Sequence, residues 1–337
     1  MKVGIINATG YIGMDLARLL LRHPRVEVAW VTGRGAAGQR LGDYLPHLDT
    51  GDMPILAEPG DADLVFSALP HKSSAEALQP IIERGTRVID LSADFRLKDA
   101  AEYRRWYEVE HPNPSLLAGA VYGLPELHRA EIAGAQIVAS PGCYPTAALL
   151  ALAPAVKEGL VEPDIIVDAK SGVSGAGREL SLTTHYSEVN ESVTAYALTG
   201  HRHLPEMLQE LRALNPTLSP TLTFMPHLIP MTRGILATCY ARLRQQASQA
   251  QIDELYREFY RDAPFVTVVG FSPQTKQTLG SNHCLVHPVV DEASGRLIAL
   301  SALDNLVKGG AGQAVQCMNL MLDLPETTGV DALAVFP

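Results

Sequence analysis

The chain has 337 residues, 47% of them hydrophobic and 19% charged, and its formal net charge is −10. This length exceeds one ordinary hydrophobic core, so two domains are expected. The acidic balance, without any stripe rich in Lys and Arg, argues against a nucleic-acid partner. No apolar run is long enough to cross a bilayer, and Met1–Asn7 becomes polar too soon for a signal peptide, so we expect a cytoplasmic protein without membrane contact.

The N-terminal segment has the pattern of a dinucleotide-binding turn. Val3–Ile6 is a short apolar run, residues 14–21 have helical apolar spacing, and Asn7-Ala-Thr-Gly-Tyr-Ile-Gly13 lies between them. Glycines in such a turn let the backbone approach a pyrophosphate, which the helix N-terminus binds. Asn7 stands where a glycine is usual, and asparagine tolerates left-handed backbone better than most residues. The residues expected to contact the cofactor here are Thr9, Gly10, Tyr11, Ile12 and Gly13.

The end of the second predicted strand, residues 26–31, indicates which dinucleotide binds. A fold that prefers NAD places Asp or Glu at this point to bond the ribose 2′-hydroxyl. This chain has Thr32-Gly-Arg34 instead. A hydroxyl and a guanidinium suit a 2′-phosphate, so the pattern favours NADP, although Arg34 would otherwise be an ordinary solvated loop charge.

Further strand-like runs alternate with helical segments through the first half of the chain. The strands are predicted at residues 64–68, 87–90 and 136–139, with a helix at 73–84. This alternation predicts a doubly wound parallel sheet of the Rossmann type. Arg96 follows the strand at 87–90, and the carboxyl edge of such a sheet faces the ligand. Arg96 is therefore a candidate anion-binding residue, with a surface salt bridge as the alternative.

Cys143 lies in Ser140-Pro-Gly-Cys-Tyr-Pro-Thr146, between a short strand and a helical run rich in Ala and Leu. Pro145 is predicted as the first helical residue, where its missing N–H is tolerated. A thiol beside a helix N-terminus is favoured in its thiolate, nucleophilic form. Most lone cysteines are small buried hydrophobic residues, but turn, helix start and thiol together favour a catalytic nucleophile.

A glycine- and serine-rich segment follows the predicted strand at residues 165–169. Two cationic residues flank three glycines and two serines in the segment Lys170-Ser-Gly-Val-Ser-Gly-Ala-Gly-Arg178. Such a loop suits phosphate or cofactor, and a flexible linker is the alternative. We expect Ser171 and Gly172 to contact the cofactor, and Lys170 and Arg178 to hold an anionic group of the substrate.

The segment Gly200-His-Arg-His-Leu-Pro-Glu206 opens a predicted helix over residues 205–214. Its two histidines offer a general acid/base near neutral pH, and Glu206 offers a carboxylate to orient one of them. His203 is favoured because the turn at Pro205 fixes it more tightly, while His201 remains open. A zinc site is discounted, since no further ligand cluster is near.

The rest of the second half predicts an α+β domain with a mostly antiparallel sheet. Its strands are expected at residues 222–225, 235–243, 265–269, 282–287 and 297–302, with a helix at 251–261. The glycines after Asp304-Asn305 would let the backbone approach the cofactor, with Asn305 contributing a contact, and the apolar helix beyond them returns to the first domain. We predict an NADP-binding domain formed by residues 1–142 and 306–337. Residues 143–305 are predicted to form a domain for catalysis and oligomerisation.

Together these motifs resemble the N-acetyl-gamma-glutamyl-phosphate reductase family, within the aspartate-semialdehyde dehydrogenase superfamily, over almost the whole chain. Ser140–Thr146 looks like the active-site signature and is the most specific element. The other similar segments are Asp90–Arg96, Tyr122–Leu127, Lys170–Gly177, His201–Glu206, Pro226–Ile235, Gln274–Lys276 and Asp304–Gly309. The resemblance implies a Rossmann domain, a catalytic and oligomerisation domain, NADP(H) and a role in arginine biosynthesis.

The resemblance also implies the substrate, an acyl phosphate that the Cys143 thiolate would convert to a thioester with release of inorganic phosphate. Reduction would then give N-acetyl-glutamate 5-semialdehyde. The related lysine-pathway reductase, which acts on a carrier-protein-linked aminoadipyl phosphate, is the alternative, and a redox sensor without chemistry is a more distant one. An exposed apolar face on the second sheet would make the protein a homodimer or homotetramer.

Overall fold

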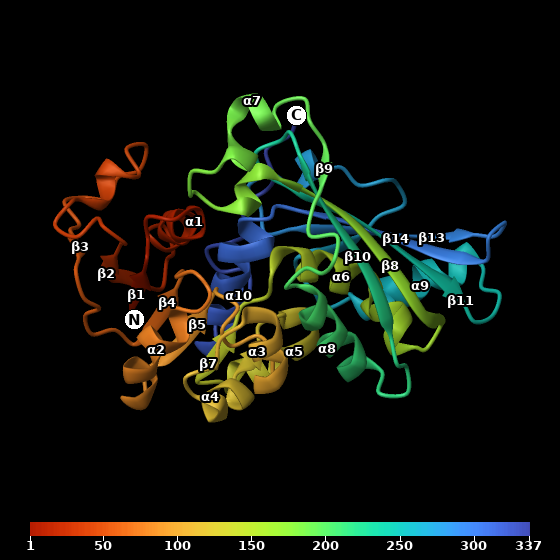
Figure 1. Cartoon of the computed structure of the whole chain (residues 1–337), viewed down its shortest axis with the longest axis horizontal. Coiled ribbons are helices and arrows are strands. Elements are labelled where there is room, and N and C mark those ends of the chain that lie inside the picture. The colour runs from red at the N-terminus through yellow and green to blue at the C-terminus, as the bar shows by residue number, and fades with distance from the viewer. The chain divides into compact units, whose positions relative to one another are not determined.

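The computed structural model describes residues 1–337, which divide into two compact units (Figure 1). The first unit contains Met1–Gly142 and Gly310–Ala332. The second contains Cys143–Gly309 and Leu333–Pro337. Among all the helices, none is both long and apolar enough to span a membrane.

The first unit is built on a seven-stranded sheet in the order β3-β2-β1-β4-β5-β7-β6, and every pairing is parallel. Its strands are β1 (Lys2–Ile6), β2 (Glu27–Thr32), β3 (Ile55–Leu56), β4 (Leu64–Ser67), β5 (Arg87–Asp90), β6 (Val121–Tyr122) and β7 (Ile137–Ala139). Its helices are α1 (Tyr11–Leu20), α2 (Ser74–Glu83), α3 (Ala100–Tyr107), α4 (Pro114–Gly119), α5 (Pro125–Ala133) and α10 (Gly312–Met321), with a 3₁₀ turn at Leu41–Asp43. This is the predicted doubly wound sheet.

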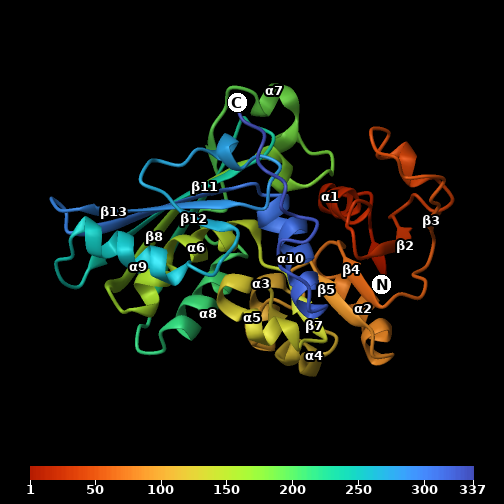
Figure 2. The ribbon, with the colours of Figure 1, turned by 180° about the vertical axis from the view of Figure 1, so that it is seen from behind.

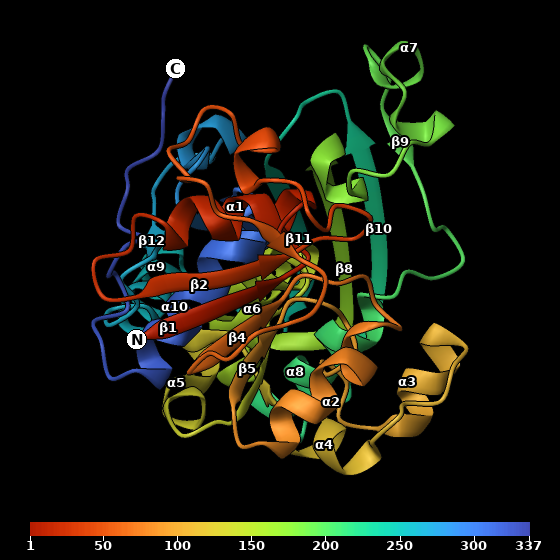
Figure 3. The same cartoon turned by 90° about the vertical axis from the view of Figure 1, so that its left-hand side faces the viewer.

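The two central strands of this sheet are β1 and β4. From β1 the chain continues to β2 and one edge of the sheet, and from β4 it continues to β5 and the other edge. Right-handed crossovers from β1 to β2 and from β4 to β5 place α1 and α2 on opposite faces, as Figure 3 shows. The carboxyl ends of β1 and β4 lie side by side, and the strand order reverses there. In an open sheet of this type that is the point at which a ligand binds.

The turn after β1 requires two unusual residues. Asn7 adopts left-handed backbone with φ +64°, which is the conformation that the sequence predicted it would tolerate. A Cβ added at Gly13 would lie 2.2 Å from the carbonyl oxygen of Asn7, so only glycine fits where α1 crosses the turn. Gly10 precedes α1 without any side-chain cap on the first N–H groups of the helix.

The second unit is built on a mixed seven-stranded sheet in the order β12-β13-β14-β11-β8-β10-β9. Four of its pairings are antiparallel, and two, β12 with β13 and β8 with β10, are parallel. Its strands are β8 (Val161–Gly172), β9 (Thr194–Ala195), β10 (Thr221–Ile229), β11 (Ile235–Leu243), β12 (Val266–Val268), β13 (Cys284–Asp291) and β14 (Arg296–Leu303). Its helices are α6 (Cys143–Lys157), α7 (Tyr186–Val189), α8 (Leu204–Leu214) and α9 (Gln249–Phe259), with 3₁₀ turns at Val173–Ala176, Leu182–Thr184 and Thr275–Thr278. A π-helix at Val307–Ala311 leads into α10.

Helices α6, α8 and α9 cover one face of this second sheet (Figures 1 and 2). Helix α6 is apolar on all sides and is buried along nearly its whole length. Pro154 cannot donate to the carbonyl of Leu150, and the Tyr260 hydroxyl donates to that oxygen at 2.6 Å instead. The hydroxyls of Tyr256 and Ser301 bond two further α6 carbonyls. These bonds fix the helix on the sheet.

Two expectations about local structure are wrong. Helix α6 begins at Cys143 rather than at Pro145, so Cys143 is itself in the first turn. The first N–H groups of a helix have no intrahelical acceptor, which is why Pro145 fits at the third position. Lys170 lies inside β8, which extends to Gly172, rather than in a loop.

Two buried aspartates organise the carboxyl ends of β4 and β5. Asp94 accepts hydrogen bonds from the backbone N–H groups of Lys72, Ser74 and Ala75 and from the hydroxyl of Tyr103. Asp90 accepts from the hydroxyls of Ser74 and Ser92. Burial and then the nearby charge of Asp94 raise the pKa of Asp90 from 3.8 to about 6.

The raised pKa of Asp90 predicts a pH-dependent contribution to stability. Because the folded state holds this proton more tightly, the contribution is fully present below pH 3.8 and is lost as the pH rises through 6. Asp90→Asn has no proton to lose. From pH 4 to pH 7 the free energy of unfolding of the variant, relative to the unaltered protein, should rise by up to about 3 kcal/mol. Urea unfolding at several pH values measures this, and a pH-independent difference contradicts it.

Candidate active site

Cys143 is the first residue of α6 and is partly exposed, whereas the residues on either side of it are buried. Its backbone lies against the π-helix. A Cβ added at Gly309 would approach the Cβ of Cys143 to 2.8 Å, so glycine is required there. The sequence predicted that glycines in this segment approach a cofactor; the structure places Gly309 against the nucleophile candidate. The backbone at Gly309 thus packs directly against the first residue of α6.

Arg96 supports the segment that precedes Cys143. Its Nε donates to the carbonyl of Ser140 at 2.7 Å, and one terminal nitrogen donates to the carbonyl of Leu91 at 2.9 Å. The side chain is buried. Within the first unit, Arg96 therefore ties the end of β5 to the residues that follow β7.

Two tyrosines lie in the electrostatic field of the Cys143 sulfur. The Tyr196 hydroxyl donates to the Tyr144 hydroxyl at 3.2 Å, and Tyr144 donates to the carbonyl of His227 at 3.0 Å. Burial raises the pKa of both phenols, and negative charge on Cys143 raises each further. Both hydroxyls are therefore neutral donors at physiological pH.

His201 is enclosed by aromatic rings. The rings of Tyr144, Tyr196, Phe224 and His203 have centroids 5.9, 5.7, 5.3 and 4.7 Å from its own. Burial, and then the nearby charge of Arg202, lower the pKa of His201 to about 4. Its Nδ1 lies 3.1 Å from the backbone N of His203 and accepts that hydrogen. The neutral ring therefore carries its proton on Nε2 and can donate from that atom.

His203 and Glu206 are placed by the start of α8. His203 is the residue before the helix, and Glu206 lies in its first turn with 1% of its surface exposed. The His203 ring centroid is 6.0 Å from that of Tyr144. Both predicted histidines therefore lie against the ring of Tyr144, the residue that follows Cys143.

The predicted loop residues lie beside this cluster. The Ser171 side chain hydrogen-bonds Tyr144 and is buried. A Cβ at Gly172 would come within 2.7 Å of the carbonyl oxygen of Thr232, so this turn also needs glycine. Asn305 ties the loop down, because its Oδ1 accepts from Gly234 N at 2.7 Å and its Nδ2 donates to Ser174 at 3.0 Å.

The structure separates Lys170 from the other predicted residues. Neighbouring residues of a strand point to opposite faces, and Ser171 faces α6, so Lys170 points to the uncovered face of the sheet. There its Nζ lies 2.7 Å from Asp168. Arg178 follows the 3₁₀ turn at Val173–Ala176 and is exposed. The cations that bracket the sequence motif are therefore not brought together.

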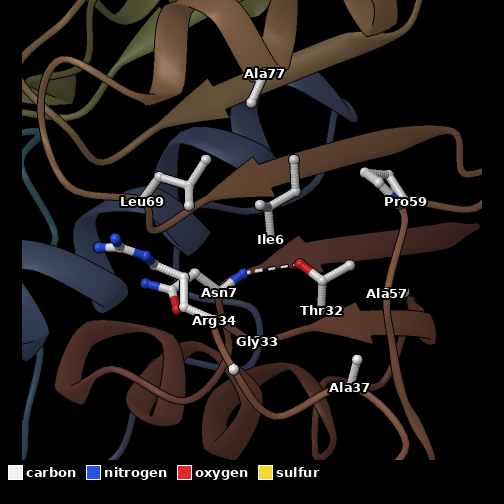
Figure 4. Close-up of a pocket in the computed structure, with 11 residues that line it drawn as sticks. Ile6, Asn7, Thr32, Gly33, Arg34, Ala37, Ala57, Pro59, Leu69 and Ala77 are labelled. Atoms are coloured by element: carbon white, nitrogen blue, oxygen red, sulfur yellow. Dashed lines mark hydrogen bonds between the residues drawn. The ribbon is translucent and has the colours of Figure 1, made fainter.

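The first unit contains a cavity of about 360 Å³ at the carboxyl edge of its sheet. The residues that line it are Ile6, Asn7, Thr32, Gly33, Arg34, Gly35, Ala37, Ala57, Pro59, Leu69 and Ala77. Figure 4 shows the side chain of Arg34 extending beside Asn7, and the Thr32 hydroxyl accepting the Asn7 backbone N–H at 3.2 Å. Thr9 lies next to this wall, since a Cβ at Gly33 would meet its methyl group. The cavity thus brings Asn7, the first residue of the glycine turn, together with Thr32 and Arg34, whereas the predicted contacts at residues 9–13 do not line it.

Three aromatic residues of the second unit had no signal that would have found them in the sequence. Tyr144 appeared only as part of the cysteine turn, and Tyr196 and Phe224 lie in segments that carry no motif. All three enclose His201. Tyr196 follows β9 and Phe224 lies in β10, so the positions of these two depend on the pairing of the two strands, and β9 has only two residues.

Two family models match the chain in succession. The "Semialdehyde dehydrogenase, NAD binding domain" matches residues 2–135, and the "Semialdehyde dehydrogenase, dimerisation domain" matches residues 143–305. A protein of Dehalococcoides mccartyi strain CBDB1, named N-acetyl-gamma-glutamyl-phosphate reductase, is 54% identical over 337 residues, which cover all of this chain and 99% of the relative. The chain belongs to the N-acetyl-gamma-glutamyl-phosphate reductase family. These reductases are oxidoreductases, which agrees with the resemblance found in the sequence motifs.

Other members of the reductase family match equally completely. The proteins of that name from Pelotomaculum thermopropionicum and Geobacter sulfurreducens are each 49% identical over the whole of this chain. Among solved structures, aspartate semialdehyde dehydrogenase II of Vibrio cholerae, complexed with ASA, has a TM-score of 0.72 at 18% identity and covers 96% of this chain and 98% of its own. The Candida albicans aspartate semialdehyde dehydrogenase with NADP has a TM-score of 0.71 at 14% identity, covering 95% and 98%. These structures share the fold of the reductase.

The aromatic enclosure of His201 predicts a measurable titration. Because burial lowers the pKa of His201 to about 4, its imidazole should be neutral above pH 5, with the hydrogen on Nε2. Phe224→Ala would admit water to the ring and raise this pKa towards 6.5. A ¹⁵N-detected NMR titration of histidine side chains measures both, with His201→Gln identifying the resonance. An Nδ1–H tautomer, or a pKa that Phe224→Ala leaves in place, contradicts the assignment.

Proposed function

We propose that this protein reduces N-acetyl-gamma-glutamyl phosphate with NADPH, forming N-acetyl-glutamate 5-semialdehyde and inorganic phosphate as a step of arginine biosynthesis. The observation that carries the proposal is the position of Cys143, in the first turn of a buried helix and in electrostatic interaction with two buried tyrosines, whose rings lie against His201. The family relationship gives the substrate, because the relatives carry that name.

The first unit fits a dinucleotide. The uncapped start of α1 offers backbone N–H groups to a pyrophosphate, and Gly13 allows the close approach. Thr32 and Arg34, which both line the cavity, suit a ribose 2′-phosphate, which supports NADP over NAD. NADPH supplies a hydride when it is bound. The contacts with NADP are proposed for Thr9, Gly10, Tyr11, Ile12, Gly13, Thr32 and Arg34, with Ser171, Gly172 and Asn305 in the second unit.

The chemistry begins at the Cys143 sulfur. The thiolate attacks the acyl-phosphate carbonyl, a C–S bond forms, the C–O bond to phosphate breaks, and phosphate leaves with its electron pair. A thioester on Cys143 results. Reduction of the thioester carbon gives a thiohemiacetal, whose C–S bond breaks to release the aldehyde and return the thiolate. The helix start supports this role, since it stabilises negative charge on sulfur in the resting and product states.

His201 is the better-supported proton donor of the two histidines. Its Nδ1 is occupied by the backbone N–H of His203, so its Nε2–H can hydrogen-bond the oxygen that becomes negative when the carbonyl is attacked. The sequence favoured His203. We now propose that His203 and Glu206 hold this turn in position, because they form the start of α8.

The anionic groups of the substrate need cations, and Arg178 is the predicted one that is exposed in the second unit. Arg96 acts on the nucleophile segment through Ser140, as a positioning residue. Lys170 has no part in this scheme, because Asp168 holds it on the other face of the sheet. We further propose a cytoplasmic enzyme that self-associates through its second unit, as the printed description of the dimerisation domain suggests.

Replacing the nucleophile should abolish turnover without unfolding the protein. Cys143→Ser keeps the volume of the side chain but removes the thiolate, so phosphate-dependent formation of NADPH from N-acetyl-glutamate 5-semialdehyde and NADP should fall by at least about a thousandfold. Absorbance at the NADPH band gives the rate. Cys284→Ala, at a buried cysteine in β13, is the matched control and should retain turnover. Near-full activity of Cys143→Ser would refute the thioester scheme, and activity with only a carrier-linked aminoadipyl substrate would favour the lysine branch.

Arg34 should decide the choice of cofactor. Hydrogen bonds to a charged group contribute about 1.5–3 kcal/mol, so Arg34→Leu should raise KM for NADP by about ten- to a hundredfold and leave KM for NAD almost unchanged. Steady-state kinetics with both cofactors measures this. The control is Arg40→Leu, which removes another arginine of the same unit that pairs on the surface with Asp43 and Asp52. Equal effects on both cofactors would contradict the assignment of the 2′-phosphate site.

A further inference from the structure

A buried amide on α10 has no hydrogen-bond partner within the protein. Gln313 is the second residue of this helix, its side chain is fully buried, and neither its Nε2 nor its Oε1 is bonded. The Oγ of Ser140, another buried side chain of the first unit, is also without a partner. Buried polar groups are almost always paired, because leaving one unpaired costs free energy, so these two exceptions need an explanation.

Helix α10 begins at the carboxyl edge of the first sheet. The guanidinium of Arg87, the first residue of β5, donates to the carbonyl of Met321 at the end of α10. In the middle of the helix, the Cys317 thiol donates to the carbonyl of Gly123 at 3.3 Å, and the N–H of Gly123 bonds the carbonyl of Ala139, which ends β7. The helix therefore runs antiparallel to β5, beside which it lies in Figure 2, and its first turn is at the end where the strands finish.

Gln313 and Ser140 lie at the same part of this edge. Gln313 is one helical turn before Cys317 and therefore on the same face of α10, the face that packs on the ends of β6 and β7. Ser140 directly follows β7, and its backbone N–H bonds the carbonyl of Asp90, the last residue of β5, at 2.8 Å. The amide and the hydroxyl thus both lie where β5 and β7 end.

The second nucleotide of a dinucleotide is expected at this part of the edge. The proposed 2′-phosphate residues, Thr32 and Arg34, lie at the end of β2, and the pyrophosphate is proposed to lie at the start of α1, after β1. A dinucleotide crosses the carboxyl edge of a doubly wound sheet, with one nucleotide on either side of the point where the strand order reverses. In the order β2-β1-β4-β5-β7, the nicotinamide half therefore extends over β4 towards β5 and β7.

The carboxamide of nicotinamide has the groups that Gln313 requires. Its oxygen can accept from Nε2 and its N–H can donate to Oε1, so the two amides can pair, and the Ser140 hydroxyl can bond either group. Asn305, the amide that the sequence predicted for the cofactor, already bonds Gly234 and Ser174 with its two groups. Gln313 has no such partners.

We infer that Gln313, together with Ser140, binds the carboxamide of the NADP nicotinamide and so fixes the rotation of the ring about its bond to the ribose. The inference explains why an unpaired amide is retained in the interior, because the bound cofactor removes the free-energy cost that the free protein carries. It rests on the NADP-dependent reaction proposed above and adds two residues to the contacts proposed there.

Calorimetric titration of Gln313→Leu with three nucleotides tests this pairing. The first is NADP, the second is its 3-acetylpyridine analogue, in which a methyl group replaces the carboxamide nitrogen, and the third is 2′-phospho-ADP-ribose, which lacks nicotinamide. The unaltered protein should bind NADP about tenfold more tightly than the analogue, and Gln313→Leu should reduce this ratio to about one. Its affinity for 2′-phospho-ADP-ribose should not change. Ser140→Ala, which removes one bond to the same group, should reduce the ratio about threefold.

The stability of the free protein separates this role from a structural one. Gln313→Leu exchanges an unpaired amide for an apolar side chain of similar volume, so the midpoint of thermal unfolding without nucleotide should stay the same or rise. Gln316→Leu is the matched control on the same helix, because the Gln316 amide bonds Glu326 at 2.8 Å. The control variant should unfold at a lower temperature and keep the ratio of the NADP and analogue affinities.

Three results would overturn the inference. They are an affinity ratio that Gln313→Leu leaves unchanged, an equal loss of affinity for all three nucleotides, and a clearly lower unfolding midpoint of the free Gln313→Leu protein. If the unaltered protein binds neither NADP nor 2′-phospho-ADP-ribose, the proposed cofactor is contradicted as well, whereas the Cys143→Ser assay tests the chemistry separately.

Discussion

The burial of α6 is the constraint on which the second unit depends. This helix is covered on all sides, so its backbone must be satisfied internally even where Pro154 removes a donor, and the hydroxyl of Tyr260 supplies the missing bond to Leu150. A helix held in this way cannot shift along its axis without breaking such bonds. Its first residue, Cys143, is therefore fixed relative to the sheet. Gly309 completes the constraint, since any side chain there would displace the cysteine.

The same arrangement explains why a histidine with a strongly lowered pKa lies against Tyr144, the residue that follows Cys143. Tyr144 lies on α6, Phe224 lies on β10, and Tyr196 follows β9. The aromatic rings therefore enclose His201 only when the helix and the strands are packed together. Each ring removes water from the imidazole, and each phenol remains neutral because it is buried as well. The neutral state of His201 is thus a property of the packed unit and not of the histidine turn alone.

The sequence predicted the first sheet well because its signals are local. A glycine turn between a strand and a helix, followed by regular alternation, specifies a doubly wound sheet, and the left-handed backbone of Asn7 was readable from the residue type. The two-residue strands β3, β6 and β9 could not be predicted, since their pairing is set by neighbours far along the chain. Lys170 was misplaced for a related reason. Only the length of β8, which runs on to Gly172, decides that Lys170 and Ser171 point to opposite faces. Cys143, His201 and His203 could be chosen as catalytic candidates because they lie in compact motifs, whereas Tyr144, Tyr196 and Phe224 could not be chosen as the residues that enclose His201.

His227 shows how the two faces of the second sheet are connected. Its carbonyl oxygen accepts the hydroxyl of Tyr144, on the side of the sheet that α6 covers, while its imidazole lies on the other side against Asp168. A strand is stiff across this distance, because its backbone is paired on both sides, with β8 and β9. The main chain of His227 is therefore held in place, and with it the carbonyl that accepts the hydroxyl of Tyr144. One residue thus serves the hydrogen-bonded pair of tyrosines through its backbone, while its side chain contacts Asp168 on the other face of the sheet.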